Sequence, residues 1–76
     1  MQHDREVDAC GLLCPLPVLR ARKALIAMAP GQVLRLLATD PAAVIDLPHF
    51  AQQAGHEFLG SEAVGDARVY WLRRGA

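Results

Sequence analysis

The pattern of apolar and polar residues in the first half of the chain predicts a strand, a helix and a second strand. Polar and apolar residues alternate weakly over 6–9, as expected for a short strand. Apolar residues at helical spacing predict a helix over 15–29, which Pro30-Gly31 ends. The run 33–39 is nearly all apolar and predicts a central strand covered on at least one face.

The second half predicts a helix and a hairpin. Thr39-Asp40-Pro41 is typical of a helix cap, followed by a short turn and then a second helix over about 47–54, which Gly55 closes. The runs 56–62 and 67–74 are strand candidates that flank the turn at 64–66.

This order of elements predicts one domain of the α/β class, an α+β two-layer sandwich. A strand, a helix and a strand in succession favour a right-handed crossover and a parallel pair. The closing hairpin makes the sheet mixed. We therefore expect β-α-β-α-β-β connectivity, with two helices on one face of a four-stranded mixed sheet across residues 1–76.

The first predicted helix carries two apolar strips. One should face the sheet and contains Val18, Ala21, Leu25, Met28 and Ala29. The other contains Leu16, Leu19 and Ile26 and lies next to Lys23. Either a wide sheet buries this second strip, or the strip is exposed and forms a docking surface.

Composition narrows the function classes. Hydrophobic residues make up 53% of the chain, while eight basic residues balance eight acidic ones, so net charge does not indicate direct nucleic-acid binding. Nucleic-acid binding would rest on fold analogy and on four arginines, without an aromatic-basic motif; they are Arg35, Arg68, Arg73 and Arg74. The Arg73-Arg74 pair is interpreted as a solvated strand end or, alternatively, as a partner contact. No apolar run is long enough to cross a bilayer, and the N-terminus lacks a signal-peptide pattern, so we expect a cytoplasmic protein without a membrane partner.

The segment Cys14-Pro15-Leu16-Pro17 carries the candidate chemistry. Proline is tolerated in the first turn of a helix, so we expect Pro15 at the first helical position and Cys14 at the N-cap. Pro17 has no amide hydrogen, which leaves Leu16 as the usual donor to the cap. The sulfur would then lie at the positive end of the helix with a lowered pKa and free lone pairs. The alternative is an inert, buried cysteine at the start of a helix.

These residues resemble the signature of the small sulfur-carrier proteins of the TusA/SirA type. That signature is a glycine, two residues, and Cys-Pro-x-Pro opening a helix with a basic pair, here Arg22-Lys23. Later segments follow the family's order and extend the resemblance over nearly the whole chain; they are Thr39-Asp40-Pro41-Ala42, Asp46-Leu47-Pro48-x-Phe50 and Gly55-His56-Glu57.

The resemblance implies a fold similar to the C-terminal domain of bacterial translation initiation factor three. It implies that Cys14 carries sulfur as a persulfide, without a separate cofactor, and that Gly11, Pro15 and Pro17 belong to the motif. The sulfur would come from a donor protein of the cysteine desulfurase or rhodanese type. It would go to an acceptor protein in tRNA thiolation, cofactor or sulfur-oxidation pathways.

Partner docking is the expectation for the residues beside the thiol. Leu16 and Leu19 could form an apolar contact, and Arg20 and Lys23 could steer an acidic partner, although a solvated basic helix face would look the same in sequence. A carrier that presents one helix end to several partners should be a monomer or a weak oligomer.

Cys10 departs from the minimal family pattern and opens other interpretations. Cys10 and Cys14 could form a dithiol redox pair, with Gly11 allowing closure, or Cys10 could act as an auxiliary thiol that releases sulfide from a Cys14 persulfide. Metal binding by both cysteines and one histidine is a weaker hypothesis, because the histidines are scattered; they are His3, His49 and His56.

Overall fold

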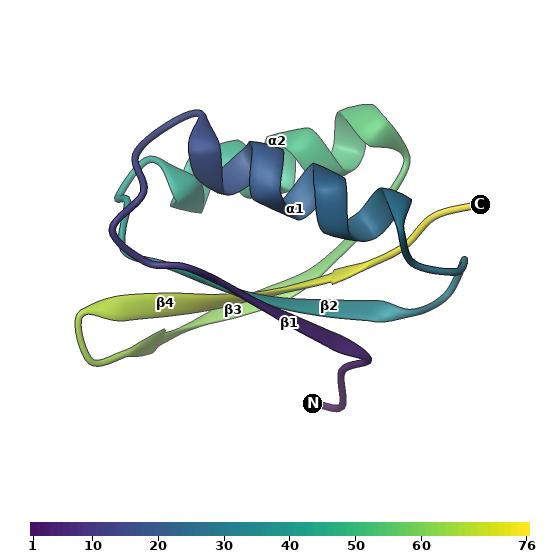
Figure 1. Ribbon diagram of the computed structural model, residues 1–76, viewed down its shortest axis with the longest axis horizontal. Coiled ribbons are helices and arrows are strands. Elements are labelled where there is room, and N and C mark those ends of the chain that lie inside the picture. Colours follow the sequence, from purple (N-terminus) through teal and green to yellow (C-terminus); the bar gives the residue numbers. More distant parts are fainter.

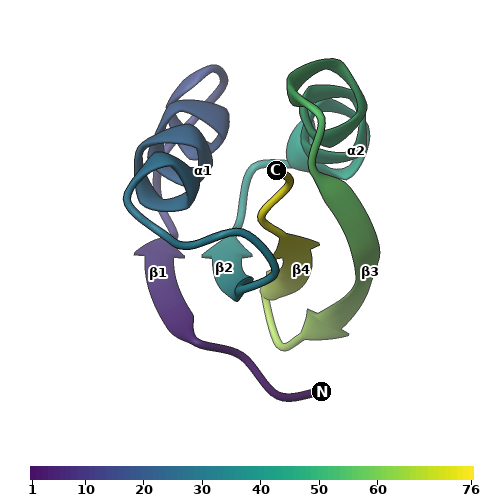
Figure 2. The same ribbon diagram turned by 90° about the vertical axis from the view of Figure 1, so that its right-hand side faces the viewer.

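The computed structural model describes residues 1–76 and shows two helices packed on one face of a four-stranded sheet (Figures 1 and 2). The elements are β1 (Arg5–Ala9), α1 (Leu16–Ile26), β2 (Val33–Ala38), α2 (Ala43–Ala54), β3 (Glu57–Val64) and β4 (Ala67–Arg73). The predicted fold class and element order are confirmed. No helix in the structure has both the length and the apolar character needed to cross a membrane.

The sheet has the order β1-β2-β4-β3, so β1 and β3 are its edges. β1 pairs with β2 in parallel, as the crossover through α1 requires, and β4 pairs antiparallel with both β2 and β3. The sheet is therefore mixed, with β2 and β4 at its centre. Because β1 and β2 are parallel, their carboxyl ends lie at the same end of the sheet, where the loops to α1 and α2 begin.

α1 ends three residues before the predicted boundary. The amides of Ala27 and Met28 bond to carbonyls three residues back rather than four, each at 3.1 Å, and this tightening ends the helix after Ile26. The following Pro30 also disfavours helical backbone at Ala29. Ala29, predicted to face the sheet, is consequently exposed.

α2 begins earlier than predicted and passes through Pro48 without a break. The sequence suggested a separate turn before a helix starting near Leu47, but one helix runs from Ala43 to Ala54. Pro48 has no amide hydrogen to donate to the carbonyl of Val44, a residue that is half exposed. Burial of Ala43, Leu47 and Ala51 along one face keeps the helix continuous. Gly55 ends it in the left-handed conformation, as predicted.

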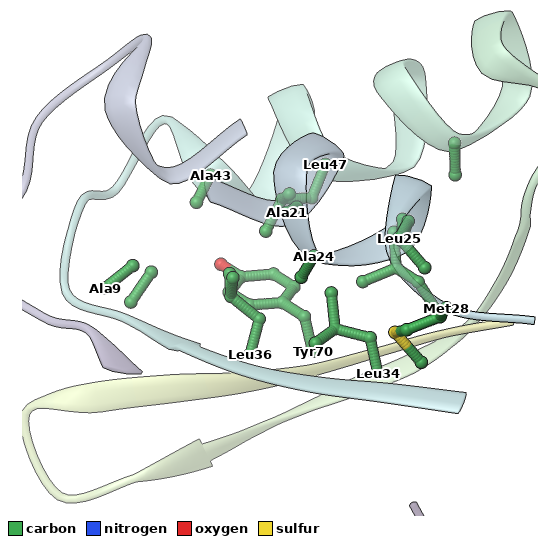
Figure 3. Packing of buried hydrophobic residues seen from close by; sticks show 13 residues of the cluster. Ala9, Ala21, Ala24, Leu25, Met28, Leu34, Leu36, Ala43, Leu47 and Tyr70 are labelled. Atoms are coloured by element: carbon green, nitrogen blue, oxygen red, sulfur yellow. The ribbon is translucent and has the colours of Figure 1, made fainter. Parts of the chain in front are cut away.

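The core lies between the helices and the sheet (Figure 3). α1 supplies Ala21, Ala24, Leu25 and the following Met28, while Val18 packs at the margin. The central strands supply their alternate residues, among them Leu34, Leu36, Tyr70 and Leu72. Small alanines on both helices let the helices approach the sheet closely, which compensates for the scarcity of aromatic side chains.

The second apolar strip of α1 lies outside this core. Leu16, Leu19 and Ile26 are 45%, 49% and 64% exposed. The residues of β4 alternate between the two faces of the sheet: Tyr70 and Leu72 face the helices, whereas Trp71 lies on the other face, where the guanidinium of Arg35 is 6.0 Å from its ring centre. The sheet does not bury the second apolar strip of α1, so the strip is exposed.

Candidate functional site

Cys14 lies in the loop that connects β1 to α1, beyond the carboxyl ends of the parallel strands. Cys14 is exposed, and the loop from β2 to α2 lies beside the β1–α1 loop at the same end of the molecule (Figure 1). Ligands and reactive groups commonly occupy this position in units built from parallel strands.

Asp40 fixes the backbone of this loop. The amide of Cys14 donates to Oδ2 of Asp40 at 2.8 Å, and the amide of Ala42 donates to Oδ1 at 3.2 Å. The aspartate is only 7% exposed, and it is the one charged residue among the buried set. One buried carboxylate therefore ties the Cys14 loop to the start of α2.

A second hydrogen bond, to Thr39 after β2, fixes the part of the loop that is closer to β1. The amide of Gly11 donates to Oγ1 of Thr39 at 2.9 Å, and Gly11 has a φ of 82°, which favours glycine at this turn. Thr39 and Asp40 were predicted to form a helix cap, and their contacts with the Cys14 loop were not predicted. The parallel pairing of β1 and β2 brings both loops to the same end of the sheet, and this predicted pairing was the signal from which their contact could have been inferred.

The start of α1 differs from the sequence prediction. Pro15 is the N-cap, and the helix begins at Leu16, so Cys14 stands one residue further from the helix than expected. The Leu16 amide, predicted to donate to the cysteine sulfur, donates instead to the carbonyl of Leu13 at 2.9 Å. Pro17 occupies the second helical position and is fully buried, so it anchors the first turn in the core.

The direction predicted for the Cys14 pKa is wrong. A hydrogen bond from the thiol to the Asp46 carboxylate, desolvation, and the negative charges of Asp46 and Asp40 together raise the pKa of Cys14 above its ordinary value of 9.0. The predicted lowering rested on the dipole of α1 alone. The opposing carboxylate belongs to Asp46 in the first turn of α2, which is distant from Cys14 in sequence.

Cys10 is also a free, exposed thiol on the same loop. Its backbone amide donates to Oδ1 of Asp8 at 2.9 Å. The pKa of the Cys10 thiol is raised first by hydrogen bonding to the Asp8 carboxylate, then by desolvation, and last by the negative charge of Asp8. Each cysteine therefore has its own aspartate, and Cys10 has no electrostatic activation of the kind expected in a reactive dithiol.

Exposed apolar side chains come from the segments on both sides of Cys14. Leu13 is 67% exposed, and α1 adds Leu16 and Leu19. The first turn of α2, which carries Asp46, adds the exposed Val44 and Ile45. Arg20 and Lys23, the predicted steering residues, are exposed further along α1 and form no ion pair.

The structure does not assemble the hypothetical metal site. No three histidine, cysteine or acidic side chains are grouped so that they could hold an ion. His56 is engaged elsewhere, because its Nδ1 accepts the amide of Gly75 at 2.9 Å and its ring packs against Phe50. His3 lies near Glu6, before β1.

Comparison with known proteins gives a consistent result. The family model described as Sulfurtransferase TusA matches residues 5–74. A protein named Sulfur carrier protein TusA from Allochromatium vinosum is 55% identical over 71 residues, covering 93% of each chain. One of the same name from Pseudomonas entomophila is 42% identical over 74 residues, covering 97% of this chain and 92% of the relative.

A solved structure agrees in fold. The crystal structure of a SirA-like protein from Desulfitobacterium hafniense superimposes with a TM-score of 0.78 at 29% identity, covering 96% of this chain and all of the other. Fold, motif order and sequence identity thus agree over almost the full length of the chain, which belongs to the TusA sulfurtransferase family.

Proposed function

We propose that this protein is a sulfur carrier that holds sulfane sulfur as a persulfide on Cys14. It receives the sulfur from a donor protein of the cysteine desulfurase or rhodanese type and passes it to an acceptor protein. One observation carries the proposal: the backbone of the Cys14 loop is fixed by Asp40 and Thr39, while Cys14 itself is exposed. Family membership supports the same role.

Loading is a thiolate displacement at sulfur. The Cys14 thiol loses its proton, and the thiolate attacks the outer sulfur of a donor persulfide. The new bond joins the two sulfurs on Cys14, and the donor's inner sulfur leaves as a thiolate that takes up a proton. Unloading is the same reaction with an acceptor thiolate as the nucleophile and Cys14 as the leaving group. No oxidant or reductant is consumed.

The site favours a carrier that reacts when a partner is docked. Asp46 and Asp40 help to raise the pKa of Cys14, so a smaller fraction of the thiol is ionised at neutral pH in the unbound protein. A cationic group brought by the donor beside Asp46 would weaken this effect. The exposed Leu13 and Leu16 offer apolar contact around the thiol. Exposure, loop geometry and docking are then the contributions of this chain to transfer.

Intact-protein mass measured without reductant tests the proposal. The parent, Cys14→Ser and Cys10→Ser proteins are each incubated with inorganic polysulfide and, separately, with a cysteine desulfurase plus cysteine. We expect the parent and Cys10→Ser to gain one sulfur atom and Cys14→Ser to gain none. Gain of sulfur by Cys14→Ser but not by Cys10→Ser would contradict the proposal, as would no gain in any protein with polysulfide. Loss of two hydrogens that depends on both cysteines would establish the dithiol alternative instead.

A further inference from the structure

A groove runs between β1 and the flank of α1, at one edge of the sheet. Figure 2 shows α1 above β1 at this edge. The groove has a volume of about 520 Å³, and its charged lining residues are Arg5, Glu6, Asp8, Arg20 and Lys23. It belongs to neither the Cys14 loop nor the exposed apolar residues around it.

The backbone of β1 is unpaired along this groove. β1 is an edge strand whose only neighbour is β2, so alternate residues direct their N–H and C=O groups away from the sheet. An extended peptide can satisfy such groups by adding as a further strand. The groove therefore offers main-chain hydrogen bonds as well as side-chain contacts.

The charges that face the groove are cationic. Arg5 is in register with Leu34, a core residue, and so points to the helix side of the sheet, where Arg20 and Lys23 lie on α1. None of these three cations takes part in an ion pair. They come from two elements that converge on one groove.

The two acidic residues of the groove lining are engaged elsewhere. Glu6 is in register with Arg35, points to the opposite face of the sheet, and pairs with Arg35 there. Asp8 shares that face and accepts the amide of Cys10. The groove thus keeps unpaired positive charge although the whole chain is neutral.

An acidic protein segment fits these features better than a nucleic acid. Charged residues that only prevent an edge strand from pairing with another chain can be positive or negative. Here the charged residues that face the groove from β1 and α1 are all positive. A nucleic acid would be favoured by an overall basic surface, which a chain of zero net charge lacks. The free strand edge has no use in phosphate binding, and it is a ready site for an extended peptide.

We propose that this groove binds an extended acidic segment of a partner protein, which pairs with β1 and directs alternate acidic side chains toward Arg5, Arg20 and Lys23. The inference rests on the proposed function, because the partner is the donor or acceptor of the sulfur. Arg20 lies four residues after Leu16, the first residue of α1, which is about 6 Å along the helix axis. A segment held here tethers the partner near the thiol without covering it, which raises the effective concentration of its reactive group.

An NMR titration tests the groove: a synthetic peptide is added to the isotope-labelled protein, and the shifts of the backbone amide resonances are measured. The probe is a capped Thr-Glu-Val-Glu-Thr-Glu-Val peptide, with a version carrying Lys in place of Glu as the charge control. We expect the acidic peptide to shift the amides of β1 and of the Arg20–Lys23 turn. Lys23→Glu should weaken binding at least about fivefold.

Arg22→Glu is the matched control, because it makes the same charge change at the neighbouring residue. Arg22 is exposed and lines a different hollow, with His49, Phe50 and Gln53. We expect it to leave binding within about twofold of the parent. An absence of shifts in β1 would overturn the proposal, as would an equal loss in both variants. Binding of a uridine oligonucleotide that depends on Lys23, with no peptide binding, would overturn it in favour of nucleic acid.

Sulfur loading by inorganic polysulfide separates this proposal from the proposed function. That reaction needs no docked protein, so Lys23→Glu should load Cys14 like the parent. Loading of the parent without peptide binding would overturn only the groove. Peptide binding by a parent that polysulfide cannot load would contradict the persulfide carrier and leave the acidic-segment site standing.

Discussion

The Asp46 carboxylate should restrain the reactivity of Cys14, and Asp46→Asn tests this directly. The pKa of Cys14 is raised most by the hydrogen bond to Asp46, then by desolvation and by the negative charges of Asp46 and Asp40. An asparagine keeps the size of the side chain and removes its charge. The pKa of Cys14 should therefore fall, and more thiolate should be present near neutral pH.

The expected change in rate follows from two opposing effects. Below the pKa, every unit by which the pKa falls raises the thiolate fraction tenfold. The nucleophilicity of the thiolate falls at the same time, by about threefold per unit, because the Brønsted coefficient is about 0.4–0.5. The net gain is about threefold to fourfold for each unit by which the pKa falls, so the reaction of Cys14 should be faster near neutral pH.

The assay is the reaction of Cys14 with a neutral dipyridyl disulfide, followed by absorbance of the released thione. A Cys10→Ser background assigns the signal to Cys14. Rates measured from about pH 6 to about pH 9 give a profile that Asp46→Asn should shift to lower pH. A neutral reagent is needed because a charged one would respond to the lost carboxylate by itself.

Asp8→Asn in the same background is the control. It makes the identical chemical change in the carboxylate that acts on Cys10, so the reaction of Cys14 should not change. An unshifted profile for Asp46→Asn, or a slower reaction at neutral pH, would refute the reasoning. In that case the α1 terminus, rather than the acidic residues of α2 and its preceding loop, would control the thiol.

Three further substitutions or conditions test the rest of the structure. Asp40→Ala removes the acceptor of two backbone amides and should lower the free energy of unfolding by about 1–3 kcal/mol in urea denaturation, whereas no loss would show that the loop is held otherwise. Tyr70→Phe should be neutral or raise that free energy by up to about 1 kcal/mol, because the buried hydroxyl has no hydrogen-bond partner; a clear loss would reveal one. Burial, and then the charge of Arg74, hold the pKa of His56 below its ordinary value of 6.5, and its Nδ1 must be unprotonated to accept the Gly75 amide. The stability that neutral His56 contributes is complete above pH 6.5 and is lost as the pH falls through the lower folded-state pKa of His56. The urea concentration at the unfolding midpoint of the parent protein should therefore decrease as the pH falls below 6.5. The midpoint of the His56→Gln variant should decrease less over the same pH range.

The strong local patterns of the sequence were enough to place most of the fold. The nearly apolar run at 33–39 and the alternation of Tyr70, Trp71 and Leu72 identified the central strands and their faces. Boundaries were harder where local signals competed. Pro48 suggested a new helix start, but burial of Ala43 and Leu47 continues one helix across it.

The candidate site divides in the same way. The Cys14-Pro15-Leu16-Pro17 segment identifies the thiol and its position before α1 from sequence alone, because proline is favoured in the first turn of a helix. The surroundings of the sulfur come from elsewhere in the chain. Asp40 and Asp46 are 26 and 32 positions away in sequence, and no local pattern indicates that they approach Cys14.

The sequence by itself determined the order of elements, the fold class and the residue that carries the candidate chemistry, since each depends on short-range periodicity and backbone preference. Only the tertiary structure decided which carboxylates meet Cys14, whether Leu16 and Leu19 are exposed, and which cations line the groove beside β1. The physical reason is that charge and burial depend on distance in space. Parallel pairing of β1 with β2 brings together loops that the sequence keeps apart.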